Sequence, residues 1–167
     1  PDLVDIYSLE VDNAKRPSQY MLDGKWHKFK KSWSTFRVKL WGPFSFPIVK
    51  SVLWSSHGPV IKAPTGVYAI RFSGLQEVGA IQQWYDMSRA KNMDEWRKAI
   101  SQNGVLSFNI TYADKEGNIG EIYNAKMPKR VEGVDWSKHL PGDTSELIWD
   151  QYLSTDELPQ IWNPSCG

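Results

Sequence analysis

Apolar and polar residues alternate along much of the first 72 positions, which is the pattern of β-strands that bury one face. The alternation predicts strands at residues 3–9, 33–40, 48–54, 60–61 and 67–72. Proline has no N–H to donate to a neighbouring strand. We therefore expect Phe46-Pro47 to break the ladder between two of these strands.

Two hairpins are indicated by turn sequences. The first is a tight turn at Asp23-Gly24, directly after the apolar residues 20–22, and this dipeptide tolerates the positive φ angles of a type I′ turn. The second is a longer, glycine-bearing loop between residues 105–113 and 119–125. Each hairpin joins two neighbouring antiparallel strands, so the sequence predicts mainly antiparallel sheets.

The period of the pattern changes in the middle of the chain, where apolar residues recur at the three-residue step of one helix face. These residues are Val78, Ile81, Trp84 and Met87. A second helix is predicted from Asn92, because Asn92 with Glu95 three residues later resembles a capping box. This helix ends at Asn103-Gly104. Its buried stripe consists of Met93, Trp96 and Ile100.

Together the strands and the two consecutive mid-chain helices predict a β-rich α+β fold. A chain of 167 residues fits one compact domain, so we expect a single domain over residues 1–167. The apolar share of 41% excludes an intrinsically disordered chain. Nine Trp, seven Tyr and six Phe indicate either a core of large rings or a groove lined with them.

Charge and cysteine content exclude several function classes. With 20 basic and 19 acidic residues there is no basic excess for a phosphate backbone, so we expect no nucleic-acid partner. No apolar run approaches the ~20 residues of a membrane helix, so we expect no membrane partner. Cys166 is the only cysteine, which excludes an internal disulfide and a cysteine-based zinc site. The chain begins at Pro1 without an initiator Met or a signal peptide, and we expect both ends to be cut.

Candidate chemistry is sparse when the residues are considered alone. His57 precedes Gly58-Pro59, but the chain has no Gly-x-Ser-x-Gly elbow and no His-Glu-x-x-His run, so a structural histidine is favoured. Asp2 and Asp5 offer two carboxylates for a hard cation such as calcium, although polar surface residues are the simpler interpretation. No complete catalytic set is present, which leaves a binding module as an alternative.

Seven short blocks, in order over nearly the whole chain, resemble the penicillin acylase family, including its acyl-homoserine lactone acylase members. The blocks are DLVDIY at 2–7, YMLDGKW at 20–26, SHGPV at 56–60, WYDMSRAKN at 84–92, YADKEGNIG at 112–120, LPGD at 140–143 and LPQIWNP at 158–164. The resemblance implies the αββα sandwich of N-terminal-nucleophile hydrolases. It places residues 1–167 inside the larger, β subunit of such an enzyme.

The resemblance also implies where catalysis occurs. In this family an N-terminal serine attacks an amide carbonyl with its own α-amino group as base, and a backbone N–H and an asparagine stabilise the oxyanion. The serine lies upstream of Pro1, and the oxyanion asparagine follows Gly167. Asn163-Pro164 matches the Asn-Pro pair that precedes this asparagine in the family, so Asn163 is not the oxyanion residue. We therefore expect no catalytic residue in this chain and no hydrolysis by the chain alone.

The same resemblance implies that particular residues of this chain bind a structural calcium ion. Asp2, the carbonyl of Val4 and Asp5 match the calcium-binding segment of the family. Trp136 stands where the family has a proline whose carbonyl binds the same ion. Calcium is thus expected in the parent enzyme, although the chemistry requires no cofactor.

Trp84 and Phe108 match positions that line the acyl pocket of the family. Phe108 replaces a smaller aliphatic residue of the penicillin G-type enzymes, which would reshape an apolar acyl site. The alternative for both residues is an ordinary place in the core of a helix and a strand. The acyl group, aryl-acetyl or fatty, stays open.

The implied partners are the small α subunit, the rest of the β subunit and a small N-acyl substrate, in a periplasmic or secreted parent. A non-catalytic binding domain with an aromatic-lined groove is the main alternative. A parent that acts on peptides or other acylated amines is a third hypothesis. Strand edges that lack partners predict self-association of the isolated chain.

Overall fold

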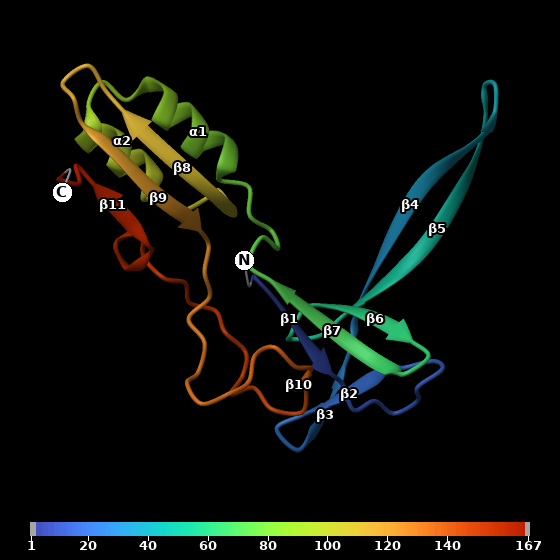
Figure 1. Ribbon diagram of the computed structural model, residues 1–167. Coiled ribbons are helices and arrows are strands. Elements are labelled where there is room, and N and C mark those ends of the chain that lie inside the picture. The colour runs from blue at the N-terminus through green and yellow to red at the C-terminus, as the bar shows by residue number, and fades with distance from the viewer. Residues whose placement is uncertain (1–2, 166–167) are drawn as a thin grey trace. The chain divides into compact units, whose positions relative to one another are not determined.

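The computed structural model describes residues 3–165 (Figure 1). Contacts divide the chain into two compact units. The sheet unit contains Val4–Phe72 and Val131–Ile148, and the helical unit contains Leu3, Ser73–Arg130 and residues 149–165. A domain can contain two such units, so the single domain predicted over residues 1–167 stays a prediction. No described helix has the length and apolar content needed to cross a membrane.

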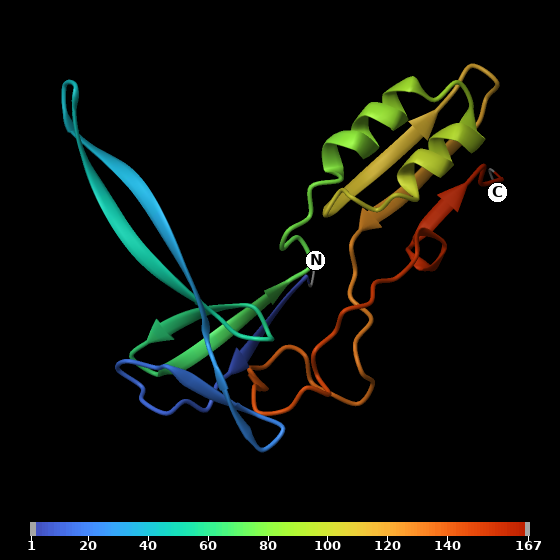
Figure 2. The ribbon, with the colours of Figure 1, turned by 180° about the vertical axis from the view of Figure 1, so that it is seen from behind.

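The described residues of the sheet unit form a six-stranded sheet and a separate hairpin (Figures 1 and 2). The sheet order is β10 (Leu140–Pro141), β1 (Val4–Ser8), β7 (Gly66–Phe72), β6 (Pro59–Ala63), β5 (Phe44–Trp54) and β4 (Lys30–Trp41). Only the β1–β10 pair is parallel. The hairpin joins β2 (Gln19–Leu22) and β3 (Lys25–Lys28). Its turn residues, Asp23 and Gly24, have φ angles of 50° and 71°, as the type I′ prediction requires.

Side chains along β1 alternate between buried and exposed, and the buried ones contribute to the core of the sheet unit. Asp5 and Tyr7 are buried on one face of the strand, while Val4 and Ser8 are exposed. The Tyr7 hydroxyl donates a hydrogen bond of 2.8 Å to the carbonyl of Leu147. Tyr7 packs in a cluster with Leu9, Val67, Ala69, Leu140 and Leu147. This cluster joins the short β10 segment to the centre of the sheet.

The expectation that Phe46-Pro47 breaks the ladder is wrong. β5 continues through Pro47, which lies directly opposite Arg37 of β4. The reason is the edge position of the ribbon: β6 pairs with β5 only at Leu53 and Trp54, so nothing along the outer side of β5 requires a donor from Pro47.

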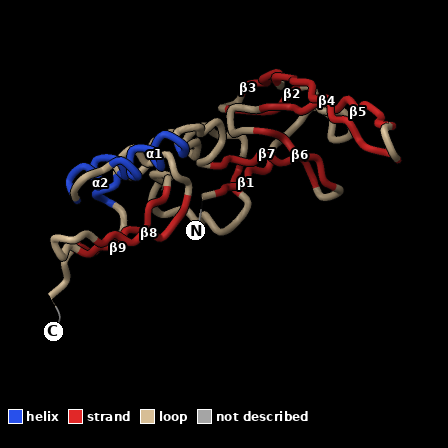
Figure 3. Tube along the Cα trace, turned by 90° about the horizontal axis from the view of Figure 1, so that it is seen from above, coloured by secondary structure: helices blue, strands red, loops and turns tan. Residues whose placement is uncertain are grey.

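The helical unit places α1 (Ala80–Arg89) and α2 (Met93–Ile100) on one face of a three-stranded sheet (Figures 1 and 3). The sheet order is β11 (Gln160–Trp162), β9 (Ile119–Ala125) and β8 (Ser107–Ala113). A 3₁₀ helix, η1 (Thr155–Glu157), precedes β11. The core between helices and sheet consists of Met87, Trp96, Ala99, Ile100, Ile110 and Ile122. These elements confirm the β-rich α+β fold with two consecutive mid-chain helices.

The two helices match their sequence patterns to different degrees. The Asn92 side chain accepts a hydrogen bond of 2.9 Å from the N–H of Glu95, so the predicted cap of α2 is confirmed. On α1, in contrast, Ile81 and Trp84 are exposed and Met87 is buried. Each three-residue step advances about 300° around a helix, so the predicted stripe drifts around α1 instead of following one face.

Candidate functional site

Trp84 on α1 and Phe108 on β8 form an aromatic pair on the surface of the helical unit. Their ring centroids are 6.3 Å apart and their planes are nearly perpendicular, at 83°. Trp84 is 44% exposed and Phe108 is 56% exposed, so neither ring is an ordinary core residue. Val78 and Ile81 are even more exposed, at 86% and 83%. Exposed apolar side chains that contact one another, as Trp84 and Phe108 do, mark a binding surface for a ligand or another segment.

A buried polar network holds α1 in place directly beside Trp84. Gln83 and Asn124 are both fully buried, and Gln83 Nε2 donates to Asn124 Oδ1 at 2.7 Å. Gln83 Oε1 accepts from the N–H groups of Gly104 and Val105 at 2.7 and 2.9 Å. Because both ends of the amide are satisfied, the network fixes α1 against β9 and the loop after α2. The apolar pattern of the sequence does not indicate Gln83, whose only signal is its position four residues before the buried Met87.

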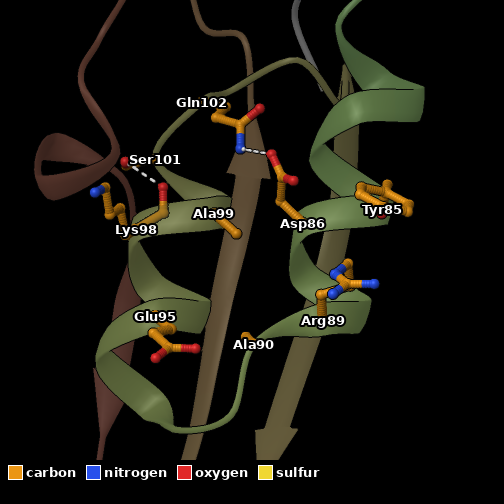
Figure 4. Close-up of a pocket in the computed structure, with 9 residues that line it drawn as sticks. All are labelled: Tyr85, Asp86, Arg89, Ala90, Glu95, Lys98, Ala99, Ser101 and Gln102. Atoms are coloured by element: carbon orange, nitrogen blue, oxygen red, sulfur yellow. Dashed lines mark hydrogen bonds between the residues drawn. The ribbon is translucent and has the colours of Figure 1, made fainter.

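A groove of about 520 Å³ runs between α1 and α2 on the surface of the same unit (Figure 4). Asp86 accepts hydrogen bonds from Gln82 at 2.9 Å and from Gln102 at 2.7 Å, and these bonds lower the pKa of its carboxyl group. The Ser101 hydroxyl donates to the carbonyl of Lys98 at 2.8 Å. The groove is lined by Tyr85, Asp86, Arg89, Ala90, Glu95, Lys98, Ala99, Ser101 and Gln102. It offers charge and hydrogen bonds but no hydroxyl paired with a base, and it does not include the aromatic pair.

The predicted calcium ligands divide into described and undescribed residues. Asp2 lies outside the described residues. Asp5 is 2% exposed and lies directly opposite Arg71 in the β1–β7 ladder. Val4 is at the exposed start of the same strand, and Trp136 is half-buried, with its indole N–H donating to the carbonyl of Val131 at 3.0 Å. Among residues 3–165, no three His, Cys, Asp or Glu side chains form a group that could hold a metal ion.

Of the four predicted ligands, the described residues supply one buried carboxylate, that of Asp5, and the carbonyls of Val4 and Trp136. Calcium takes six to eight oxygen ligands. These three donors are oxygen atoms, the ligand type that calcium prefers, and they are fewer than a full shell.

His57 is fully buried in the sheet unit, with its ring centroid 4.5 Å from that of Tyr7. Its Nε2 atom lies 3.4 Å from the carbonyl of Thr144. Burial lowers the pKa of His57 and the nearby Arg71 acts in the same direction, although the Thr144 carbonyl favours the charged form. A buried imidazole between a phenol ring and a main-chain carbonyl fits the structural role that the sequence favoured.

Asn163 also has a structural environment. Its Oδ1 atom accepts from the N–H of Ile119 at 2.9 Å, and its Nδ2 donates to Asn118 Oδ1 at 3.0 Å. Both ends of the side-chain amide are thus occupied by the β8–β9 loop and the start of β9. These bonds anchor the end of β11 to its neighbouring strand.

Comparisons with known proteins agree on one group. The family described as penicillin amidase matches residues 1–167. Penicillin G acylase of Escherichia coli is 29% identical over 170 residues, which cover 99% of this chain and 19% of that protein. An acyl-homoserine lactone acylase of Pseudomonas fluorescens is 26% identical over 182 residues, which cover 93% of this chain and 23% of that protein.

A solved structure is similar over the same extent. The thermostable penicillin G acylase from Alcaligenes faecalis matches with a TM-score of 0.80 and 29% identity, covering 98% of this chain and 29% of that chain. The chain therefore spans about a fifth of the length of the two curated relatives named above.

Proposed function

We propose, since the chain belongs to the penicillin amidase family, that it is an internal segment of a longer amide hydrolase and carries part of the wall of its acyl-binding site. The observation that carries this proposal is the exposed Trp84–Phe108 pair, with rings at 6.3 Å and 83°. Two aromatic rings that share an apolar surface suit a hydrophobic acyl group. The buried Gln83–Asn124 bond keeps one of these rings at a fixed place.

The hydrolytic step belongs to residues outside this chain. We place the nucleophile in an N-terminal serine of the longer protein, whose own amino group removes the hydroxyl proton. Within this chain, the buried His57 imidazole contacts the Tyr7 ring and the Thr144 carbonyl, which is a structural environment and not that of a catalytic base. The chain alone is then inactive. It forms a part of the larger subunit, next to a small subunit, in a periplasmic or secreted enzyme.

The substrate class is an amide with an apolar acyl group. The relatives' names describe acylases for penicillin G and for acyl-homoserine lactones. Both substrates join a hydrophobic acyl group to a polar amine. The exposed rings of Trp84 and Phe108 recognise the acyl half. Acylated peptides and other acylated amines contain the same amide bond and are therefore included in the test.

A calcium ion is proposed as a structural ligand of the longer enzyme. Asp5 would contribute its buried carboxylate, and Val4 and Trp136 their carbonyls, with Asp2 and other segments completing the shell. The ion supports the fold and takes no part in the chemistry. By calorimetry, we expect no heat of calcium binding for the isolated chain and measurable binding by the longer protein. Asp5→Asn should weaken it, and equal binding by the two proteins would refute the shared site.

Activity of the longer protein tests the main proposal. Release of phenylacetate from penicillin G, of the fatty acid from N-dodecanoyl-homoserine lactone and of the acyl group from an acylated peptide is measured with the same preparation. Trp84→Ala should lower kcat/KM for at least one of them on the order of tenfold. Trp26→Ala is the matched control, because Trp26 is 47% exposed but lies on β3 of the other unit.

Three outcomes separate the hypotheses. Hydrolysis that depends on Trp84 and not on Trp26 supports the acyl wall. Binding of these compounds without hydrolysis favours the non-catalytic binding domain with an aromatic-lined groove. If both variants retain full hydrolysis, Trp84 is not part of the acyl-binding site.

A further inference from the structure

The ribbon formed by β4 and β5, which we name the arm, carries large apolar side chains that the described residues leave uncovered. Figures 1 and 2 show it extending beyond the other strands of its sheet as a two-stranded ribbon. β4 is the last strand of the sheet, and β6 pairs with β5 only at Leu53 and Trp54. A two-stranded ribbon is marginally stable on its own, so its faces and edges require a partner.

The register gives the arm one apolar face. Phe36 lies opposite Ile48, and Val38 lies opposite Phe46, and directly opposed residues point to the same side of a ribbon. Phe36, Val38 and Phe46 are 47%, 42% and 59% exposed. The other side presents Thr35, Arg37 and Lys39 with their partners Val49, Pro47 and Ser45. Trp33 and Val49 are exposed on that other side, at 66% and 59%. Between residues 36 and 48, however, the large apolar side chains Phe36, Val38, Phe46 and Ile48 share one face, which indicates an interaction surface.

The arm also lies in a stretch of the sequence whose charged side chains are all positive. Residues 24–76 contain nine Lys and Arg and no Asp or Glu, while the rest of the chain contains 11 basic and 19 acidic residues. Five of the nine cations are in the arm: Lys30, Lys31, Arg37, Lys39 and Lys50. Among the described residues, none of these five forms an ion pair. Two arms packed on each other would repel, so a carboxylate-bearing surface is the complementary partner.

The free edges of the arm favour a polypeptide over a lipid surface. Along its distal half, both β4 and β5 present main-chain N–H and C=O groups without a neighbouring strand. Inserted into hydrocarbon, these groups would have no hydrogen-bond partners, which is strongly unfavourable. A polypeptide can pair with such an edge and cover the apolar face at the same time.

We propose that the apolar face of the arm, formed by Phe36, Val38, Phe46 and Ile48, docks onto the remaining polypeptide of the longer amidase. The docking surface has an apolar centre and carboxylates at its rim. The proposal rests on the proposed function in one respect, namely that a longer polypeptide carries this chain. The relatives extend far beyond the matched segment, so most of their length is available to form this surface.

Hydrogen–deuterium exchange of residues 30–54, compared between the isolated chain and the longer polypeptide, tests the docking. We expect slower exchange of the arm in the longer polypeptide. Val38→Ser should raise that exchange rate roughly tenfold, the factor for losing one buried valine side chain. Val49→Ser is the matched control on the opposite face, where it is 59% exposed, and should change the rate less than about twofold. Exchange of β7 in the same sample reports whether each variant is folded.

Three outcomes would overturn the docking. Equal exchange of the arm in both proteins means that the longer polypeptide does not cover it. Protection that requires phosphatidylglycerol vesicles assigns the face to a lipid surface. Protection that grows with the concentration of the longer polypeptide assigns it to a second copy. Amide hydrolysis is measured on the same preparation, so a protected arm without activity refutes the proposed function and leaves the docking intact.

Discussion

Trp84 and Phe108 meet edge to face, with ring centroids 6.3 Å apart, although one lies on α1 and the other on β8. The geometry matches the favoured arrangement of two quadrupolar rings, in which a positive edge faces a negative face. Both rings nevertheless stay about half exposed. The pair is therefore held together at the surface and keeps apolar area free for a ligand.

Phe108→Ile in the longer protein should change the acyl preference. The substitution removes the edge-to-face contact with Trp84 and opens space beside its ring, so the ratio of kcat/KM between phenylacetyl and dodecanoyl amides should shift on the order of tenfold. Phe44→Ile is the matched control, because Phe44 is 58% exposed and also contacts a tryptophan, Trp41, at 5.4 Å. An unchanged ratio in the Phe108 variant would show that this ring does not contact the acyl group.

Gln83→Ala should destabilise the helical unit by roughly 3 kcal/mol, because it leaves the N–H groups of Gly104 and Val105 and the amide of Asn124 without partners in a buried site. The free energy of unfolding is measured by urea denaturation. Gln82→Ala is the neighbouring control, since Gln82 is exposed and its only described bond is to Asp86 on the surface. It should cost less than about 0.5 kcal/mol. Equal losses for both variants would contradict the network.

Local features of the fold were predictable because a few neighbouring residues determine them. The turn at Asp23-Gly24 requires only two positive φ angles, and the cap of α2 requires only Asn92 and the N–H of Glu95. Both were therefore correct from the sequence. The same holds for the strands β8 and β9, which flank the glycine-bearing loop as predicted.

Features that depend on distant neighbours were not predictable. The continuation of β5 through Pro47 depends on which strand lies beside it, and the sequence does not contain that information. The buried side of α1 is set by Asn124 on β9 and by the loop after α2, so the polar Gln83 lies inside while the apolar Ile81 lies outside. The partnership of Trp84 with Phe108 was suggested by family resemblance alone, because nothing in the spacing relates the two residues.

Asn92→Ala should lower the stability of the helical unit by about 1 kcal/mol, since it removes the acceptor for the N–H of Glu95 at the start of α2. Asn92→Asp retains an oxygen acceptor at the same position and should restore nearly all of that stability. Thermal unfolding followed by far-ultraviolet circular dichroism measures both variants. If the aspartate variant is as unstable as the alanine variant, the side-chain bond is not the stabilising element.

The stability of the sheet unit should decrease as the pH falls below about 6.5. Burial lowers the pKa of His57 in the folded chain below its ordinary value of 6.5, so the unfolded chain binds a proton first as the solution becomes acidic. The contribution of the neutral imidazole is fully present above that value and is lost as the pH falls toward the folded-state pKa. Arg71 strengthens the effect, while Asp23 and Asp143 oppose it.

Urea denaturation at pH 7.5 and at pH 5, above the range in which most carboxylates titrate, measures this loss. His57→Asn should make the free energy of unfolding less dependent on pH between these values, whatever its effect on the stability at pH 7.5. His139→Asn provides the control, because His139 is exposed and contacts Tyr68 by its ring at 5.1 Å. If the His57 variant keeps the full pH dependence of the original chain, a group other than this buried imidazole binds the proton that unfolding takes up.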